Sequence, residues 1–164
     1  MNESVRAALG PEGSFPLALV LLGNPWRGDD AVGPFLAERL SGRLDDRCVL
    51  IPAFERPEEA WEAAVACRPR RVVMVDAADF GGRPGEIRVT PPAGSEVPPL
   101  STHRFPVEAV ARLIEADTGA PVLLLLVQAA ACRLGTPPTE AVRATAQRLA
   151  DYLETLYARE PSGR

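Results

Sequence analysis

The chain has 164 residues, 46% of them hydrophobic and 24% charged, and a formal net charge of −4 at pH 7. This length predicts one domain with one core, and no apolar run approaches the roughly 20 residues that a bilayer span requires. The acidic balance disfavours a nucleic-acid surface, which depends on clustered cations. The first residues lack a basic segment followed by a long apolar run, which disfavours a secretory signal. We therefore expect a cytoplasmic protein that binds neither nucleic acid nor membrane.

Three segments are predicted along the chain: a flexible N-terminal extension over residues 1–15, a single domain over residues 16–158, and a tail over residues 159–164. The three cysteines, Cys48, Cys67 and Cys132, are far apart and form no CxxC pair. That spacing favours buried thiols over a disulfide framework or a zinc ribbon. We expect the domain to be a monomer.

The first half of the domain alternates apolar runs with helical patterns. Residues 17–22 (LALVLL) form an uninterrupted apolar run that predicts a buried strand, and the spacing over residues 35–44 favours a helix. Residues 48–51 predict a short second strand. Residues 57–67 predict a second helix, because a proline suits its first turn and acidic residues follow. Two strand–helix units result.

The second half continues this alternation with one exception. Residues 71–75 predict a third strand, and residues 86–90 (EIRVT) alternate as a half-exposed edge strand does. The short connection between them leaves no room for a crossover helix, so the edge strand should run antiparallel. Prolines exclude regular structure after it. The remaining predicted elements are a helix over 106–117, a strand over 122–127 and a closing helix over 139–157. Together they predict a three-layer α/β/α sandwich of about five mostly parallel strands with one antiparallel edge strand.

The first candidate motif, GNPWRGDDAVG, spans residues 23–33 and follows the first strand. An acid before a helix commonly caps it, and this is the structural interpretation for Asp29. Both acids cannot fill one cap, so Asp30 is expected to face the cleft. Pro34 is an alternative first helical residue, which would place both acids in the preceding loop. The motif is neither a P-loop nor GxGxxG, and two adjacent carboxylates would repel a phosphate.

Two further residues can join Asp30 at one site. Asp76 ends the run RVVMVD, and charged groups at the carboxyl ends of central strands commonly face the site crevice. Asp79 suits a structural turn instead. His103 is the only histidine, and capping or exposure is an equally good interpretation of it. Two carboxylates and one imidazole suit a borderline divalent metal, so the trio is a candidate metal or catalytic site.

The ordered motifs GNPWRGDDAVG, VDAAD with PGEIR, and STHRFPV resemble those of the [NiFe]-hydrogenase maturation endopeptidases, in particular the branch acting on hydrogenases of the formate hydrogenlyase type. The resemblance runs from about Leu17 to the closing helix. It implies an α/β/α fold and a protease that removes a C-terminal extension from the hydrogenase large subunit precursor after nickel insertion. It also implies that nickel is carried by the substrate and recognised there, so the enzyme need not bind a permanent metal.

Position by position, the resemblance places the family's nickel contacts and catalytic residues on Asp30, Asp76 and His103. A metal held there could polarise the scissile carbonyl or activate a water. The chain departs from the family twice. It has AFERPEE where many members have a glycine-rich turn, although Pro57-Glu58 resembles the branch, and it has Gln128-Ala129 where the branch has Gln-Pro. Gln128 remains a candidate contact for the substrate tail.

Three alternatives remain open from the residues. Ser101 or a thiol paired with His103 would give a different protease, although no GxSxG or HExxH motif is present. The GNP segment also resembles peptidyl-tRNA hydrolase, but Asn2 and Asn24 are the only asparagines and the charge is acidic. Finally, the same trio could serve a nickel-dependent checkpoint or chaperone that binds the large subunit without cutting it.

Overall fold

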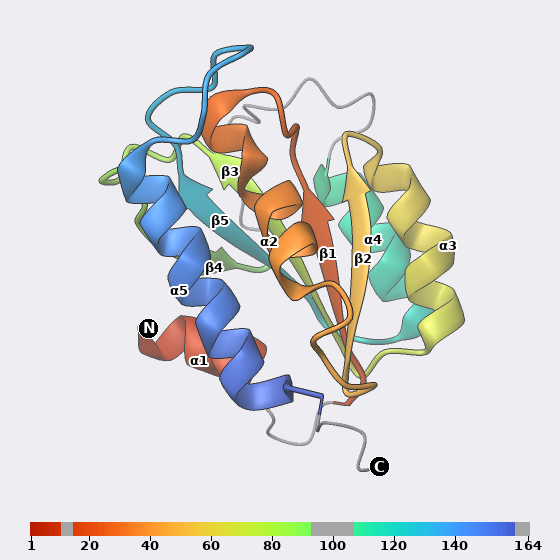
Figure 1. Ribbon diagram of the computed structural model, residues 1–164. Coiled ribbons are helices and arrows are strands. Elements are labelled where there is room, and N and C mark those ends of the chain that lie inside the picture. The colour runs from red at the N-terminus through yellow and green to blue at the C-terminus, as the bar shows by residue number, and fades with distance from the viewer. Residues whose placement is uncertain (11–14, 93–106, 160–164) are drawn as a thin grey trace.

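The computed structural model describes residues 1–10, 15–92 and 107–159. Its strands form one five-stranded sheet in the order β2-β1-β3-β5-β4 (Figure 1). The first three pairings are parallel, and β4 runs antiparallel to β5 at the edge. The strands are β1 (Leu17–Leu22), β2 (Cys48–Phe54), β3 (Arg71–Ala78), β4 (Ile87–Thr90) and β5 (Val122–Gln128). The predicted mixed sheet with one antiparallel edge strand is confirmed.

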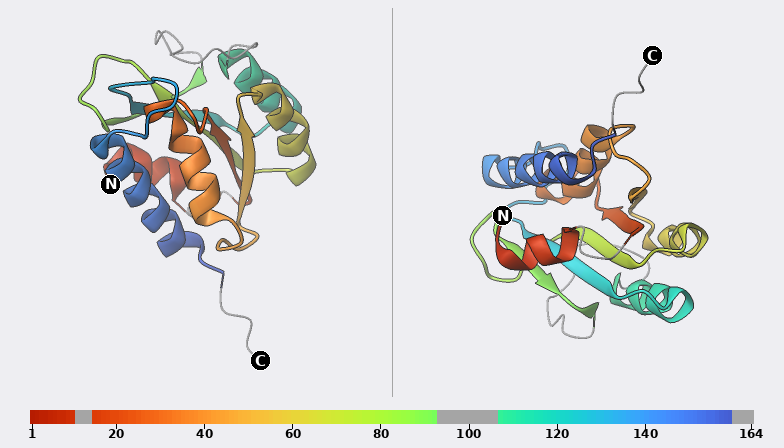
Figure 2. Two further views of the ribbon diagram at one scale, coloured as in Figure 1. Left: turned by 45° about the horizontal axis from the view of Figure 1, so that its top comes forward. Right: turned by 90° about the horizontal axis from the view of Figure 1, so that it is seen from below.

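Helices cover both faces of this sheet and complete the predicted three layers. The helices are α1 (Glu3–Leu9), α2 (Val32–Leu40), α3 (Pro57–Cys67), α4 (Val107–Thr118), α5 (Glu140–Tyr157) and the short 3₁₀ turn η1 (Gly28–Ala31). Helices α1, α2 and α5 pack on one face, and α3 and α4 pack on the other (Figure 2). Among the described helices, none has the length and apolar character needed to cross a bilayer.

The uninterrupted apolar run of β1 follows from its central position. Alternate side chains of a strand point to opposite faces. Leu17, Leu19 and Leu21 therefore enter the core beneath α1, α2 and α5, while Val20 and Leu22 enter the core beneath α3 and α4. Because both faces are covered, no position of this strand needs a polar side chain.

The prediction of a flexible extension over residues 1–15 is wrong for its described part. Asn2 caps α1 by accepting a 2.9 Å hydrogen bond from the Val5 N–H. Val5, Ala8 and Leu9 are buried in the core beneath α5. The hydroxyl of Tyr157 donates to the Leu9 carbonyl at 2.5 Å, which fastens the helix to the end of α5. The cap and the 3–4 spacing of the apolar residues explain why this segment forms a packed helix.

The other boundaries differ by a few residues. The helix predicted over 35–44 begins at Val32 and ends at Leu40, shortly before Gly42 with its φ of 70°. Pro34 is therefore not the first helical residue. It lies within the first turn, where backbone N–H groups have no intrahelical partner and a proline costs no hydrogen bond. Strands β2 and β3 each extend three residues beyond their predicted ends, to Phe54 and Ala78.

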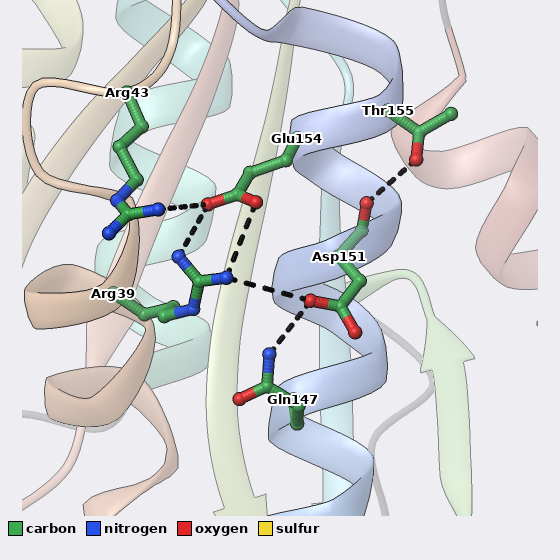
Figure 3. A network of polar contacts seen from close by, with 6 residues as sticks. All are labelled: Arg39, Arg43, Gln147, Asp151, Glu154 and Thr155. Atoms are coloured by element: carbon green, nitrogen blue, oxygen red, sulfur yellow. Dashed lines mark hydrogen bonds and ion pairs between the residues drawn. The ribbon is translucent and has the colours of Figure 1, made fainter.

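An ion-pair network joins α2 to α5 (Figure 3). Arg39 on α2 forms a forked contact with Glu154 on α5, with distances of 2.7 Å from Nη1 to Oε1 and 3.4 Å from Nη2 to Oε2. Arg43 reaches the same carboxylate at 3.3 Å through one nitrogen only. The Arg39 side chain is 29% exposed and that of Arg43 is 57% exposed, so the Arg39 pair is less screened by solvent.

This difference predicts unequal effects of two similar substitutions. Arg39→Ala should lower the free energy of unfolding by about 1 kcal/mol, because a forked and partly buried pair is lost. Arg43→Ala is the matched control and should cost less than about 0.5 kcal/mol. Urea unfolding of both variants measures the difference. Equal losses would show that the forked geometry contributes nothing beyond a surface ion pair.

Candidate functional site

The candidate site lies at the edge of the sheet where β1, β3 and β5 end. Parallel strands bring their carboxyl ends to the same edge, so the segments that follow them lie together. Here these are the β1–α2 turn with η1 and the β5–α5 connection, and Asp76 lies close to them, two residues before the end of β3 at Ala78. Figure 1 shows the β5–α5 connection beside the β1–α2 turn, beyond the ends of the strands.

The β1–α2 turn owes its shape to Gly23 and Asn24. Gly23 has a φ of 120°, and a Cβ on it would lie 1.9 Å from the Asp30 carbonyl oxygen. That carbonyl instead accepts the Asn24 N–H at 3.0 Å, which closes the turn around the two acids. The Asn24 side chain accepts the Trp26 N–H at 2.8 Å and donates to Glu55 at 2.7 Å. Gly23 and Asn24 thus determine the positions of Asp29 and Asp30.

Asp29 is completely buried and binds the β5–α5 connection. Its Oδ2 accepts the N–H groups of Ala130 at 2.7 Å and Ala131 at 2.9 Å, and its Oδ1 accepts the Thr139 N–H at 2.6 Å. Burial opposes ionisation, yet the three donors outweigh it and hold the pKa of Asp29 below its ordinary value. Asp29 has a structural role, but the prediction that it caps the following helix is wrong: α2 has no side-chain cap, and the backbone that Asp29 binds lies about 100 residues along the chain.

Asp30 and Asp76 are both buried and come together at the carboxyl edge. Burial and, next in size, the nearby Asp30 carboxylate raise the pKa of Asp76 to about 8, with a smaller contribution from Glu108 on α4. One hydrogen bond opposes this shift, from the Ala77 N–H to Oδ1 at 2.9 Å. Two adjacent buried acids resist double ionisation, and a cation beside them would relieve that cost.

The third predicted residue, His103, lies outside the described residues. Within residues 1–10, 15–92 and 107–159, no group of three or more His, Cys, Asp or Glu side chains is positioned to hold a metal ion. The described part of the site thus supplies two carboxylates. Hard oxygen donors of this kind suit a divalent cation that brings further ligands of its own.

Gln128, at the end of β5, holds the turn that follows β3. Its Oε1 accepts the N–H groups of Phe80 and Gly82, both at 2.9 Å. Its Nε2 donates to Asp79 at 3.0 Å and to the Ala129 carbonyl at 2.8 Å. All four hydrogen-bonding positions of the amide are used within the protein. Gln128 is therefore better interpreted as a support for this turn than as a contact for the substrate tail.

Asp79 has the structural role that its turn position predicts. Its Oδ1 accepts the Gly81 N–H at 3.1 Å, as in an Asx turn. The hydrogen bonds from the Gln128 amide and from the Gly81 N–H hold the pKa of Asp79 below its ordinary value. An exposed, ionised acid fixed in this way serves as a matched comparison for Asp76.

Cys132 lies near Asp29 and Asp30, a position that the sequence does not predict. Burial and the carboxylates of Asp30 and Asp29 raise the pKa of its thiol. Burial also raises the pKa of Cys67, and that of Cys48 to about 12. Reactive cysteines typically have a lowered pKa, and the pKa of each of these three thiols is raised.

The raised pKa of Asp76 predicts a pH-dependent stability. Unfolded Asp76 ionises near pH 4 and the folded group near pH 8, so the folded state binds the extra proton in between. Its contribution to stability is therefore fully present below pH 4 and is lost as pH rises towards 8. Asp76→Asn cannot ionise, so its stability relative to wild type should rise between pH 5 and pH 8.5, by an amount on the order of several kcal/mol. Urea unfolding at the two pH values measures this, and a constant difference would contradict the buried-acid assignment.

Known proteins resemble the chain over most of its length. It is 32% identical over 142 residues to the hydrogenase 3 maturation protease of Escherichia coli K12, which covers 86% of each chain. The crystal structure of the [NiFe] hydrogenase maturation protease HycI from Thermococcus kodakarensis superposes with a TM-score of 0.83 at 31% identity, covering 93% of this chain and 97% of that one. The solution structure of the endopeptidase HycI from E. coli gives 0.76 at 28% identity, covering 90% and 98%. No family model matches the chain.

Proposed function

The chain belongs to the hydrogenase maturation proteases, and we propose that it is the endopeptidase that removes a C-terminal extension from the large subunit precursor of a [NiFe] hydrogenase. The partner of this protein is then the precursor, and its location is the cytoplasm. Family membership makes the chain a hydrolase of peptide bonds. The similarity to hydrogenase maturation proteases supports a hydrogenase subunit as the substrate, and the buried acids at the carboxyl edge fit a substrate that carries a cation.

The observation that carries the proposal is the buried pair of acids, Asp30 and Asp76. A structural acid is normally satisfied by donors, as Asp29 is by three backbone N–H groups. Asp76 also accepts a hydrogen bond, from the Ala77 N–H, but burial and Asp30 raise its pKa to about 8. Perturbed acids at a sheet edge are typical of functional sites, because selection for stability alone would replace them.

Nickel enters this proposal as a part of the substrate. Asp30, Asp76 and His103 are the residues that would contact it, each through an oxygen or imidazole donor suited to a divalent ion. A cation arriving with the precursor would favour the ionised form of Asp76, so only a nickel-loaded precursor would be held well. The hydrolysed bond belongs to the precursor, and water supplies the hydroxyl of the new carboxylate and the hydrogen of the new amine.

The mass of the precursor tests proteolysis directly. Purified protein is incubated with nickel-loaded large subunit precursor, and the mixture is analysed by intact-protein mass spectrometry. We expect loss of a C-terminal peptide from the precursor and the matching peptide in solution. A stable complex in which the precursor keeps its full mass would instead identify a nickel-dependent checkpoint or chaperone.

A further inference from the structure

An exposed apolar pair lies beside the acids of the candidate site. Trp26 is 71% exposed and Leu134 is 76% exposed, the highest values among the large hydrophobic side chains of the described residues. They come from the β1–α2 turn and from the β5–α5 connection, two segments about 100 residues apart. The carbonyl of Trp26 accepts the Gly135 N–H at 2.7 Å, so the two side chains belong to neighbouring backbone segments.

The backbone beneath this pair is held firmly. The Gly28 N–H donates to the Thr136 carbonyl at 3.1 Å, and the Asp29 N–H donates to the Ala131 carbonyl at 2.9 Å. A Cβ on Gly28 would lie 2.4 Å from that same Ala131 carbonyl oxygen, so the segments are in close contact. The buried Asp29 carboxylate adds its hydrogen bonds to the connection at both ends. The exposed side chains therefore stand on ordered backbone, which lowers the entropy lost when a partner binds.

Leu134 lies at the tip of a tight turn. The Arg133 carbonyl accepts the Thr136 hydroxyl at 2.8 Å and the Thr136 N–H at 3.3 Å, and Gly135 has a φ of 78°. Leu134 at this tip is exposed and does not pack into the core. The adjacent Arg133 is exposed and places a positive charge at the margin of the pair.

We propose that Trp26, Leu134 and Arg133 form a docking surface for the folded surface of the large subunit precursor next to its nickel. This inference rests on the proposed function. The facing surface would be apolar, with an acidic group near its edge to match Arg133. Trp26 and Asp30 lie on the same turn, so a partner seated on Trp26 has its neighbouring surface beside the acids. Exposed tryptophans on ordered loops are typical energetic centres of protein interfaces.

The test compares cleavage kinetics of the double variant Trp26→Ala/Leu134→Ser with those of Leu113→Ser. Leu113 is also an exposed leucine, at 53%, but it lies on α4 and serves as the matched control. We expect the double variant to raise KM for nickel-loaded precursor by at least about tenfold while kcat changes little. Arg133→Glu should also raise KM, and the increase should shrink at high salt. All three variants should keep the wild-type melting temperature, because the replaced side chains are exposed.

Three results would overturn the docking surface, and they differ in whether the proposed function survives. Wild-type cleavage with an unchanged KM in the double variant would refute docking and leave the proposed function intact. A wild-type dimer in sedimentation that the double variant abolishes would assign the surface to a second copy of the chain. Wild-type protein that neither binds nor cleaves the loaded precursor would remove the proposed function together with the docking surface.

Discussion

Replacement of Asp30 or Asp76 by asparagine should abolish cleavage of the nickel-loaded precursor, with a fall in kcat/KM of at least about 100-fold for each variant. Asparagine keeps the size of the side chain and one oxygen but removes the negative charge that the site would offer to a cation. The Ala77 N–H can still donate to the remaining oxygen at position 76, so the local backbone should not change. Initial rates of peptide release measure the effect.

Asp79→Asn is the matched control for this experiment. Asp79 lies three residues beyond Asp76 but is exposed and serves the following turn through Gly81 and Gln128. Its replacement should leave kcat/KM near the wild-type value. Asp76→Asn should also be at least as stable as wild type at pH 8, which separates loss of activity from loss of folding. Wild-type cleavage by both Asp30→Asn and Asp76→Asn would remove the pair from the active site.

Replacement of Asp29 by alanine should produce the largest loss of stability. The substitution removes three hydrogen bonds from the N–H groups of Ala130, Ala131 and Thr139 to a charged carboxylate, and each such bond contributes about 1.5–3 kcal/mol. A loss of at least about 3 kcal/mol is therefore expected. The pKa of Asp29 is lowered in the folded state, so its contribution is present above the unfolded pKa and disappears as pH falls through the folded one.

The measurement is chemical unfolding of Asp29→Ala and wild type at neutral and strongly acidic pH. The difference in the free energy of unfolding should shrink as the pH is lowered, because wild-type Asp29 becomes protonated. Asp46→Ala removes a fully exposed acid and should leave stability nearly unchanged, as a control for the loss of one negative charge. A small, pH-independent effect at Asp29 would mean that its hydrogen bonds do not anchor the β5–α5 connection.

The sequence predicts the architecture of the domain and the proximity of Asp30 and Asp76. Apolar runs such as residues 17–22 are diagnostic because both faces of a central parallel strand are buried. Asp30 and Asp76 are predictable as neighbours because Asp30 follows β1 and Asp76 lies near the carboxyl end of β3, and these two strands are adjacent. The short β3–β4 connection excluded a crossover helix, which correctly predicted the antiparallel edge strand.

Contacts between distant segments could not be predicted in this way. Nothing in the sequence near Asp29 indicates that its carboxylate oxygens accept hydrogen bonds from backbone N–H groups about 100 residues along the chain. Nor does any sequence spacing indicate that Cys132 lies near Asp30. The sequence leaves Gln128 as a candidate contact for the substrate tail, whereas its amide is fully used in supporting the turn after β3. The N-terminal helix was missed because its short apolar pattern is ambiguous until the face beneath α5 is known to be available.

The nickel dependence of cleavage is the decisive measurement of whether Asp30 and Asp76 recognise a nickel-loaded substrate. The same large subunit precursor, prepared with and without nickel, is incubated with the wild-type protein, and release of the C-terminal peptide is followed by mass spectrometry. Release should be rapid from the loaded precursor and slow from the nickel-free form, and the rapid release should be lost in Asp30→Asn and Asp76→Asn. Equal release from both forms would contradict recognition of nickel by these carboxylates.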